Sequence, residues 1–520
     1  MSSIAGASGH TPLRGVGRVL VPVIVATVIC VALDVALLAW IGAGPPAGKG
    51  DGFFLELALL LAGASVISAT AILAPSAARA SIPLLFIVMA WHTGFQVPLE
   101  PTGEFVLTVF DVLVPLALIL GLIGEWYVSG TGVRSWFGQY WKLMAVFWGF
   151  CVWGLALAIV NDISADPLLA NLKSFIIYPL IMIILPWCIR SWKQLYLAVG
   201  LLVALVFERT LEGLYQAYTH QVLKFQTLIH GQIVYRIDGH MAATNQYADY
   251  LLTGALIALA IVAASRLRLG QRLSLAAPLA LTALALLLTY SRGAWLGTLV
   301  ALLAMLMMMR PRRAFLTMGV LAGIVIVIEA LHPGAGGSIL QRTFNDYDHS
   351  IATRKLFEAT GYTVLLHYPF GAGWGAWFQL VPGGIQAIPG FPWYHDDYLQ
   401  LATEVGIPGV IPMLAILFSI VVAGWRASVR ADNATKAALM AGVTAAFVGI
   451  LVQTATDQFL WHADIAPHIW IVAGLVLSGA ALVGADRRRK QTIADAMKYA
   501  ENADTPAPPG LPQPAGRATF

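Results

Sequence analysis

Long apolar stretches recur along almost the whole chain, separated by short polar connections. A bilayer crossing needs about 20 mostly apolar residues, and the pattern holds fourteen candidates of roughly that length. Two prolines and a histidine interrupt the third, and only two residues separate the ninth from the tenth. The pattern therefore predicts 12 to 14 transmembrane helices. The candidate spans are 19–41, 53–74, 81–97, 105–124, 143–160, 174–189, 195–213, 246–265, 273–290, 293–309, 314–331, 406–425, 437–456 and 467–484.

Composition agrees with that pattern. Hydrophobic residues make up 58% of the chain and charged residues 11%, whereas soluble proteins have about 25% charged residues. This excludes a water-soluble enzyme and a disordered protein. A net charge of +4 spread over 520 residues gives no concentrated basic face, so no nucleic-acid partner is expected. We predict an all-α, polytopic integral membrane protein.

The distribution of Lys and Arg predicts the orientation. With the N-terminus in the cytoplasm, 22 of the 31 cationic residues fall on the cytoplasmic side, as the positive-inside rule requires. Both termini are then cytoplasmic. Of the nine exceptions on the outer face, six fall in three places: a loop at 214–245, the connection Ser291-Arg292, and a long loop at 332–405.

These features divide the chain into five expected regions. They are N-terminal transmembrane helices (1–213), central transmembrane helices (214–331) with a periplasmic loop at 214–245, a periplasmic loop subdomain (332–405), C-terminal transmembrane helices (406–484), and a disordered cytoplasmic tail (485–520).

The loop at 332–405 is far longer than the usual connection, and loops of that length are usually functional or disordered. Its aromatic patches, which include 373–377 and 392–395, indicate a folded region. An amphipathic helix is expected around 353–367. We predict a partly helical subdomain lying on the bilayer surface.

His395 is the first candidate for chemistry. It lies before the twelfth candidate span, with Asp396 and Asp397 beside it. A histidine can act as a general base near neutral pH, and an adjacent carboxylate can orient it. The alternative is an interfacial aromatic and histidine cluster that anchors the helix end.

Three arginines on the same predicted face are candidates for binding an anion. Arg292 lies between two apolar runs, where an arginine is costly, and its planar side chain suits phosphate oxygens; the alternative is an arginine that reaches the headgroups. Arg236 lies at an outer helix mouth, where it could instead be a loop residue paired with Asp238. Arg354 could face substrate or lipid phosphate.

Four stretches together resemble the motifs of one family. They are SRGAWL at 291–296, HDDYLQLATEVGIPG at 395–409, Arg354 followed by HYPFGAG at 367–373, and Arg236 followed by Asn245. In this order they are similar to the motifs of the bacterial O-antigen ligase and polymerase superfamily. Asp396 stands where the family usually has asparagine.

The resemblance implies a function. Members are membrane glycosyltransferases of the GT-C class, which transfer a glycan from undecaprenyl diphosphate to an acceptor hydroxyl on the periplasmic face of the bacterial inner membrane. The acceptor is lipid A-core for ligases, a glycan for polymerases, or protein for some relatives. The chemistry is metal-independent and inverting, with no cofactor. His395 would be the catalytic base, and Arg236, Arg292 and Arg354 would bind the diphosphate. The supporting residues would be Asp396, Asp397, Gln400, Glu404 and Asn245.

Two rival classes remain open. A transporter or flippase of lipid-linked glycans would also need many spans, outer basic sites and contacts with membrane lipids. It would not explain a histidine motif confined to one face. The second rival is a non-catalytic membrane assembly factor. A protein O-oligosaccharyltransferase is the alternative within the family. The sequence does not identify the glycan or the acceptor.

Overall fold

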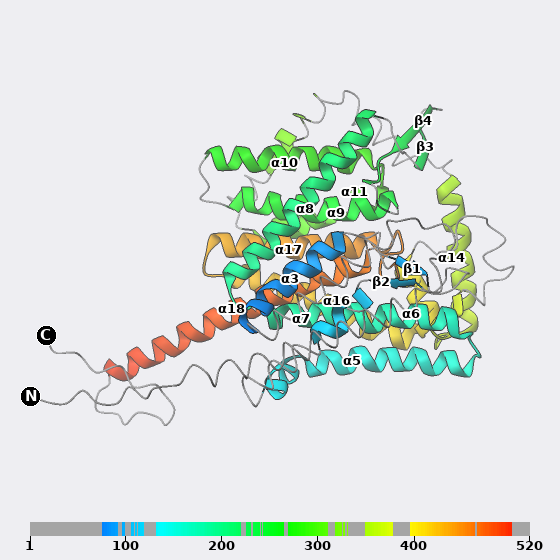
Figure 1. The fold of residues 1–520 in the computed structure, drawn as a ribbon, viewed down its shortest axis with the longest axis horizontal. Helices are drawn as coiled ribbons and strands as arrows, with labels where there is room; N and C mark the ends of the chain where they lie inside the picture. Colours follow the sequence, from blue (N-terminus) through cyan, green and yellow to red (C-terminus); the bar gives the residue numbers. More distant parts are fainter. Residues whose placement is uncertain are drawn as a thin grey trace, which may run out of the picture.

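A computed structural model describes most of the chain from residue 75 to residue 501 (Figure 1). Two of the predicted spans, 19–41 and 53–74, lie outside the described residues. The spans 81–97, 105–124 and 314–331 are described only in part, and 246–265 lacks its last residue. The described residues are 75–91, 96–98, 106–108, 110–111, 113–118, 132–219, 225–229, 232–239, 241, 243–264, 269–309, 318–324, 326–327, 330, 349–377, 396–462 and 465–501.

Helices dominate the described part of the chain, and two short antiparallel hairpins, β1–β2 and β3–β4, complete it. The elements are α3 (Pro75–Trp91), β1 (Gln96–Pro98), β2 (Val106–Thr108), α5 (Gly132–Val160), α6 (Ala165–Ile177), the 3₁₀ turn η1 (Tyr178–Leu180), α7 (Ile181–Cys188), α8 (Trp192–Thr219), β3 (Phe225–Ile229), β4 (Gln232–Arg236), α9 (Thr244–Ala264), α10 (Leu269–Leu288), α11 (Arg292–Met308), α14 (His349–His367), α16 (Asp397–Arg430), α17 (Ala434–Gln453) and α18 (Ala466–Glu501).

Six described segments are long and apolar enough to cross a membrane, and α10 and α11 are shorter apolar helices. This confirms an all-α polytopic membrane protein, while the total of 12 to 14 spans stays a prediction. The six segments are Trp141–Val160, Asn171–Cys188, Thr244–Ala263, Asp397–Arg430, Ala434–Gln453 and Ala466–Lys498.

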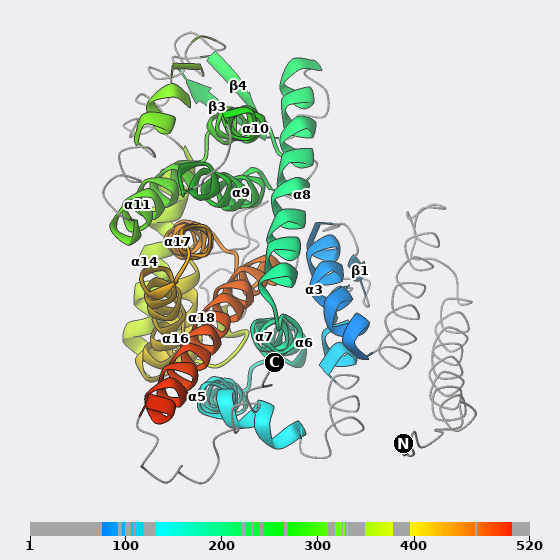
Figure 2. The ribbon, with the colours of Figure 1, turned by 90° about the vertical axis from the view of Figure 1, so that its left-hand side faces the viewer.

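The long helices lie side by side with similar axes, as Figures 1 and 2 show for α5, α9, α10, α11, α16 and α17. Helix α9 lies at the centre, where 94% of its span is buried. Helix α14 lies across one end of this bundle, beside the ends of the others (Figure 1). The helix expected at 353–367 is therefore present and begins four residues earlier, at His349. Its direction fits a helix that lies along a bilayer surface.

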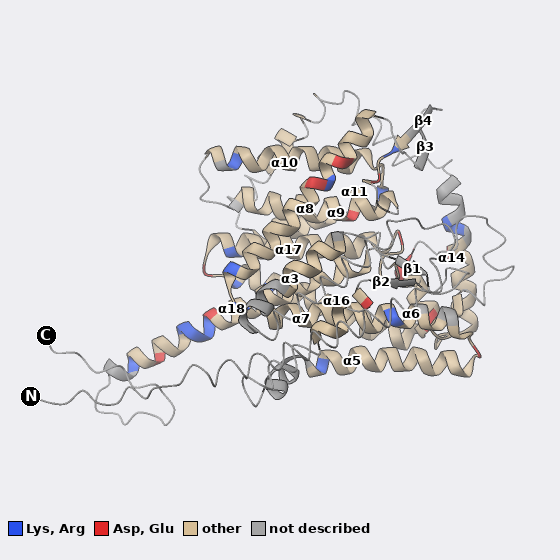
Figure 3. Ribbon diagram, viewed as in Figure 1, with Lys and Arg blue, Asp and Glu red and all other residues tan. Residues whose placement is uncertain are grey.

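Lys and Arg residues lie at the end of the bundle opposite α14, around the α16–α17 connection and along α18, and others lie on and near α14 itself (Figure 3). At the α16–α17 connection, Lys436 bridges Asp432 at 3.2 Å and Asp486 at 2.6 Å. Which end faces the cytoplasm stays a prediction.

Small residues allow close packing between α11 and α17. A Cβ atom on Gly297 would lie 2.6 Å from the carbonyl oxygen of Gly449, and Ala301 is fully buried nearby. Close approach of helix backbones through small residues is characteristic of packing in membranes. This packing fixes the start of α11, which carries Arg292.

A glycine break shapes the start of α16. Gly406 has φ 68° and ψ −179° inside the helix, a conformation that favours glycine. Because the helix opens there, the carbonyl oxygens of Thr403 and Glu404 accept hydrogen bonds from Ala372 (2.9 Å) and Gly373 (2.7 Å). The stretch at 367–373 is thereby attached to α16.

The structure corrects two expectations. Residues 485–501, expected as part of a disordered tail, continue α18 as far as Glu501, because alanine, arginine, lysine and methionine there are strong helix formers. The loop expected at 214–245 contains the β3–β4 hairpin and the end of α8. In addition, α16 begins at Asp397, nine residues before the predicted span at 406–425.

Candidate functional site

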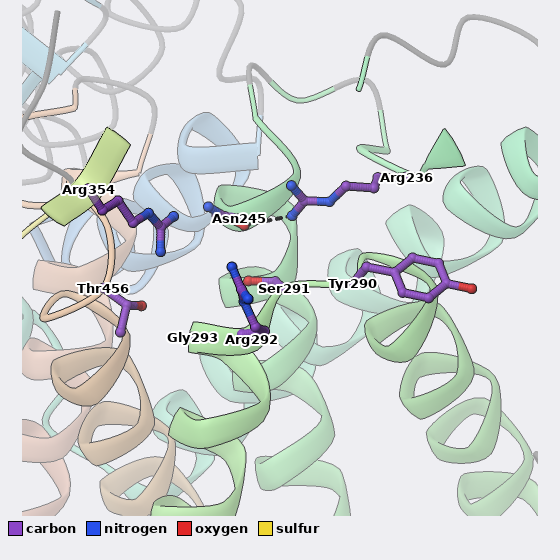
Figure 4. Close-up of a pocket in the computed structure, with 8 residues that line it drawn as sticks. All are labelled: Arg236, Asn245, Tyr290, Ser291, Arg292, Gly293, Arg354 and Thr456. Atoms are coloured by element: carbon purple, nitrogen blue, oxygen red, sulfur yellow. Dashed lines mark hydrogen bonds between the residues drawn. The ribbon is translucent and has the colours of Figure 1, made fainter. Parts of the chain in front are cut away.

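One pocket brings together the three arginines singled out from the sequence. We name it the arginine pocket; it encloses about 300 Å³ of empty space, part of which is open to solvent. Figure 4 shows the guanidinium groups of Arg236, Arg292 and Arg354 pointing toward the same space. The pocket is lined by Arg236, Asn245, Tyr290, Ser291, Arg292, Gly293, Arg354 and Thr456.

Arg236 is held in place by two hydrogen bonds. It is the last residue of β4, and its Nε donates to the carbonyl oxygen of Thr289 at 2.7 Å. Its Nη2 donates to Oδ1 of Asn245 at 2.8 Å. The guanidinium is therefore bound to the α10–α11 turn on one side and to the first turn of α9 on the other.

Asn245 connects Arg236 to an acidic residue. Its side-chain Nδ2 donates to Oδ2 of Asp457, while its backbone carbonyl oxygen accepts a hydrogen bond from Nε2 of Gln453 at 2.8 Å. The amide thus has a cation on its oxygen and a carboxylate on its nitrogen. This arrangement fixes the orientation of the amide, and with it that of Arg236.

Arg292 is the first residue of α11, directly after a tight turn. Tyr290 in that turn has φ 50°, an uncommon value for a residue other than glycine. Ser291 caps α11, its Oγ accepting from the N–H of Ala294 at 3.4 Å. A Cβ on Gly293 would overlap Oγ1 of Thr456. In the SRG sequence, Ser291 therefore caps α11, Arg292 lines the pocket, and Gly293 allows close contact with Thr456.

Arg354 comes from α14, the helix that lies across the end of the bundle. The buried residues of α14, Phe357, Gly361 and Val364, recur at helical spacing. The ring of Phe357 meets that of Trp377 edge-on, with centroids 6.1 Å apart. Because one face of α14 is seated in this way, Arg354, one turn earlier, lines the pocket.

The electrostatics of the arginine pocket favour an anion. Arginine stays protonated in proteins, and the N-terminus of α11 adds a partial positive charge where Arg292 lies. Guanidinium groups bind phosphate oxygens through paired N–H donors. Three such groups and one helix N-terminus around a small pocket fit a group with several negative oxygens, such as a diphosphate.

His395 lies outside the described residues, so its position is not described here. Asp396, the next residue, caps α16: its Oδ1 accepts hydrogen bonds from the N–H groups of Tyr398 (2.9 Å) and Leu399 (3.1 Å). Burial raises the pKa of Asp396, as does the nearby charge of Glu358 on α14, while the two backbone N–H groups lower it. Burial prevails.

The other acidic and amide residues of that motif are buried. Oδ2 of Asp397 accepts from the N–H groups of Phe459 (2.9 Å) and Leu460 (3.0 Å). Oε1 of Glu404 accepts from Asn171 (3.0 Å) and Gln400 (3.3 Å). Neither lines the arginine pocket, so in this structure they fix the start of α16 rather than contact the pocket.

Sequence reasoning missed the importance of the segment after α17. Thr456 lines the pocket and Asp457 contacts Asn245, while the carbonyl oxygen of Thr454 accepts from the N–H of Asp397 at 3.0 Å. The segment therefore connects the arginine pocket to the start of α16. The cluster of polar residues directly after an apolar span was the available signal in the sequence.

Part of this chain matches a known protein family. Residues 277–414, about a quarter of the chain, match the family described as O-antigen ligase. The match includes Arg292, Arg354 and the start of α16. A search of curated proteins finds no match. The family match confirms the resemblance seen in the motifs: residues 277–414 are similar to the O-antigen ligase family.

Proposed function

We propose that this protein is a glycosyltransferase that moves a glycan from an undecaprenyl-diphosphate carrier to an acceptor hydroxyl at the outer face of the inner membrane. The observation that carries the proposal is the arginine pocket, in which Arg236, Arg292 and Arg354 converge from three different elements. The match of residues 277–414 to the O-antigen ligase family supports it independently.

The proposed reaction has one bond formed and one broken. The acceptor oxygen attacks the anomeric carbon of the donor sugar, and the bond from that carbon to the diphosphate oxygen breaks. The configuration at the carbon inverts, and undecaprenyl diphosphate leaves. Negative charge grows on the leaving oxygen in the transition state, where prearranged cations act most strongly. The three arginines would supply those cations.

The acceptor hydroxyl loses a proton in this reaction, and we assign that proton to His395. The support is its sequence context: it directly precedes Asp396, which caps α16, and α16 is bonded to the segment that lines the pocket. A neutral imidazole near pH 7 has the basicity that general-base catalysis needs.

We expect the reaction to need no metal, because arginine can neutralise the diphosphate. The purified protein should therefore transfer glycan equally well with and without EDTA. A loss of activity in EDTA that Mg²⁺ restores would contradict this part of the proposal.

The experiment that tests the function offers the purified protein a labelled undecaprenyl-diphosphate glycan with one acceptor at a time: lipid A-core, a second carrier-linked glycan, or a Ser/Thr peptide. Release of undecaprenyl diphosphate together with a labelled product identifies an enzyme and its acceptor. A flippase would move the donor between leaflets of a vesicle and break no covalent bond, and an assembly factor would do neither.

The orientation is a separate part of the proposal. Since the cationic clusters lie at the end opposite α14, we infer that the α14 end is periplasmic and that both termini are cytoplasmic. A reporter that is active only in the periplasm, fused near Gly384, should be active. Activity of a cytoplasmic reporter at that position would place the arginine pocket on the wrong side for this donor.

A further inference from the structure

We propose that Gln216 is a positioning residue for the arginine pocket, acting through Asp238 and Gly239 to hold Arg236 in place. The inference rests on the proposed function only for the nature of the ligand. Gln216 belongs to the last turn of α8, outside the pocket, and it lies in none of the motifs found in the sequence.

The side chain of Gln216 makes three hydrogen bonds to the loop that follows Arg236. Its Nε2 donates to Oδ1 of Asp238 at 3.0 Å. Its Oε1 accepts from the backbone N–H groups of Asp238 at 3.3 Å and Gly239 at 2.9 Å. Gln216 is 1% exposed and Asp238 is fully buried. Water therefore cannot substitute for these bonds, and their loss would leave buried polar groups without these partners.

The same loop is held from its other side. Nη1 of Arg209 donates to the carbonyl oxygen of Gly239 at 3.1 Å, and the hydroxyl of Tyr247 donates to the carbonyl oxygen of Arg209 at 2.8 Å. Gly239 has φ 54° and lies against the ring of Tyr247, where a Cβ would overlap the ring. The loop at 237–239 is thus fixed between α8 and α9.

This loop determines where Arg236 can lie. Arg236 ends the β3–β4 hairpin, where it pairs with Phe225. Two residues later, Asp238 makes the first contact with Gln216. The guanidinium must meet both Thr289 and Asn245 from this backbone position. A shift of about 1 Å in a positioning contact can reduce catalysis markedly, so a change at Gln216 should be felt at the pocket.

The chemistry of the contact allows a swap that separates positioning from stability. Gln216→Glu removes the donor and sets two carboxylates against each other. Asp238→Asn alone is mild, because an amide can still accept from Gln216. In the double variant Gln216→Glu/Asp238→Asn, the new carboxylate accepts from both backbone N–H groups and from the new amide, which restores all three bonds.

The test measures binding of inorganic pyrophosphate by calorimetry in detergent, together with thermal midpoints. We expect Gln216→Glu to weaken binding roughly 10- to 100-fold, corresponding to loss of bonds that involve charged groups. The swap should return to within a few-fold of wild type. In an Arg236→Ala background, Gln216→Glu should cause no further loss. Gln194→Glu, at the opposite end of α8, is the matched control and should bind as wild type does.

The outcomes are distinguishable. If wild type does not bind pyrophosphate, the proposed function is wrong, and the positioning role fails with it. If wild type binds and Gln216→Glu binds equally well, only the positioning role is wrong. Equal further loss in the Arg236→Ala background would mean that Gln216 acts on general stability. Should Gln216→Glu not fold, Gln216→Met is expected to give the same loss of binding, and normal binding there overturns the proposal.

Discussion

Nη2 of Arg236 donates to Oδ1 of Asn245 at 2.8 Å, joining the end of β4 to the first turn of α9. The other end of the same amide donates to Asp457. Asn245 therefore orients an arginine through a neutral group. A carboxylate in its place would cancel part of the positive charge that the proposed diphosphate needs.

Asn245→Ala should reduce transfer without removing any charge from the pocket. A hydrogen bond to a charged group contributes about 1.5–3 kcal/mol, so kcat/KM should fall roughly 10- to 100-fold. The control is Asn433→Ala. Asn433 caps α17 at the end of the bundle opposite the pocket, where its Oδ1 accepts a hydrogen bond from the N–H of Thr435 at 2.7 Å. Its loss should lower stability by about 0.5–2 kcal/mol and leave kcat/KM unchanged. Equal activity losses in both variants would refute the orienting role.

His395→Ala should reduce turnover while leaving the affinity for the donor intact. General-base catalysis contributes about 10²- to 10⁴-fold, and the base acts in the reaction step rather than in binding. Single-turnover rates and donor affinity, measured on the same preparation, separate the two effects. A rate within a few-fold of wild type would make His395 an anchor, and a collapse of binding would make it a ligand of the donor.

Asp396 gives a prediction about pH. Because burial raises its pKa in the folded protein, the folded state binds this proton more tightly than the unfolded state, whose ordinary Asp pKa is about 3.9. The contribution to stability is complete below that pH and is lost as the pH rises through the raised pKa. Asp396→Asn keeps a capping side chain and removes the titration.

The thermal midpoint of Asp396→Asn relative to wild type should therefore increase as the pH rises from about 4. Asp396→Ala serves as the comparison: it removes both the titration and the cap, so it should be less stable than Asp396→Asn by about 0.5–2 kcal/mol at every pH. A difference between wild type and Asp396→Asn that does not change with pH would contradict the raised pKa.

Much of the fold could be predicted because hydropathy reports directly on burial in lipid. Helices α9, α10 and α11 each lie within a few residues of a predicted span. The β3–β4 hairpin was not predicted, although its strands, FQTLI and QIVYR, are rich in strand-forming residues and only two residues separate them. The break at Gly406 was also hidden, because an apolar run looks the same whether or not one glycine in it leaves the helix.

Part of the candidate site could be predicted, because a charged residue within an apolar stretch is rare and points to a function. Arg292 stands out because arginine is costly near a membrane. Gln216 gives no such signal, since an amide at the end of an amphipathic helix is ordinary, and its partner Asp238 is 22 residues away. The sequence also does not separate Arg354, which lines the pocket, from Glu404, which is buried in a network. Those differences depend on tertiary contacts.

Gly406→Ala tests the packing that supports the site. A residue with a Cβ at this φ and ψ, a region used almost only by glycine, costs about 1–3 kcal/mol, and the Cβ would also overlap the backbone of Phe370. The thermal midpoint should fall clearly. Gly200→Ala in α8 is the matched control, because no atom lies within 4 Å of its Cβ position, and it should be neutral or stabilising by about 0.5–1 kcal/mol. Similar midpoints for the two variants would argue against the break in α16.

The most direct test of the arginine pocket is single-turnover release of undecaprenyl diphosphate from a synthetic donor by wild type, Arg292→Ala and Arg292→Lys. Arg430→Ala, at the far end of α16, is the control and should release at the wild-type rate. We predict that Arg292→Ala abolishes release and that Arg292→Lys is also poor, because a point charge does not replace a planar fork on phosphate. Release by Arg292→Ala at the wild-type rate, at equal protein level, would contradict the account and remove this arginine from the site.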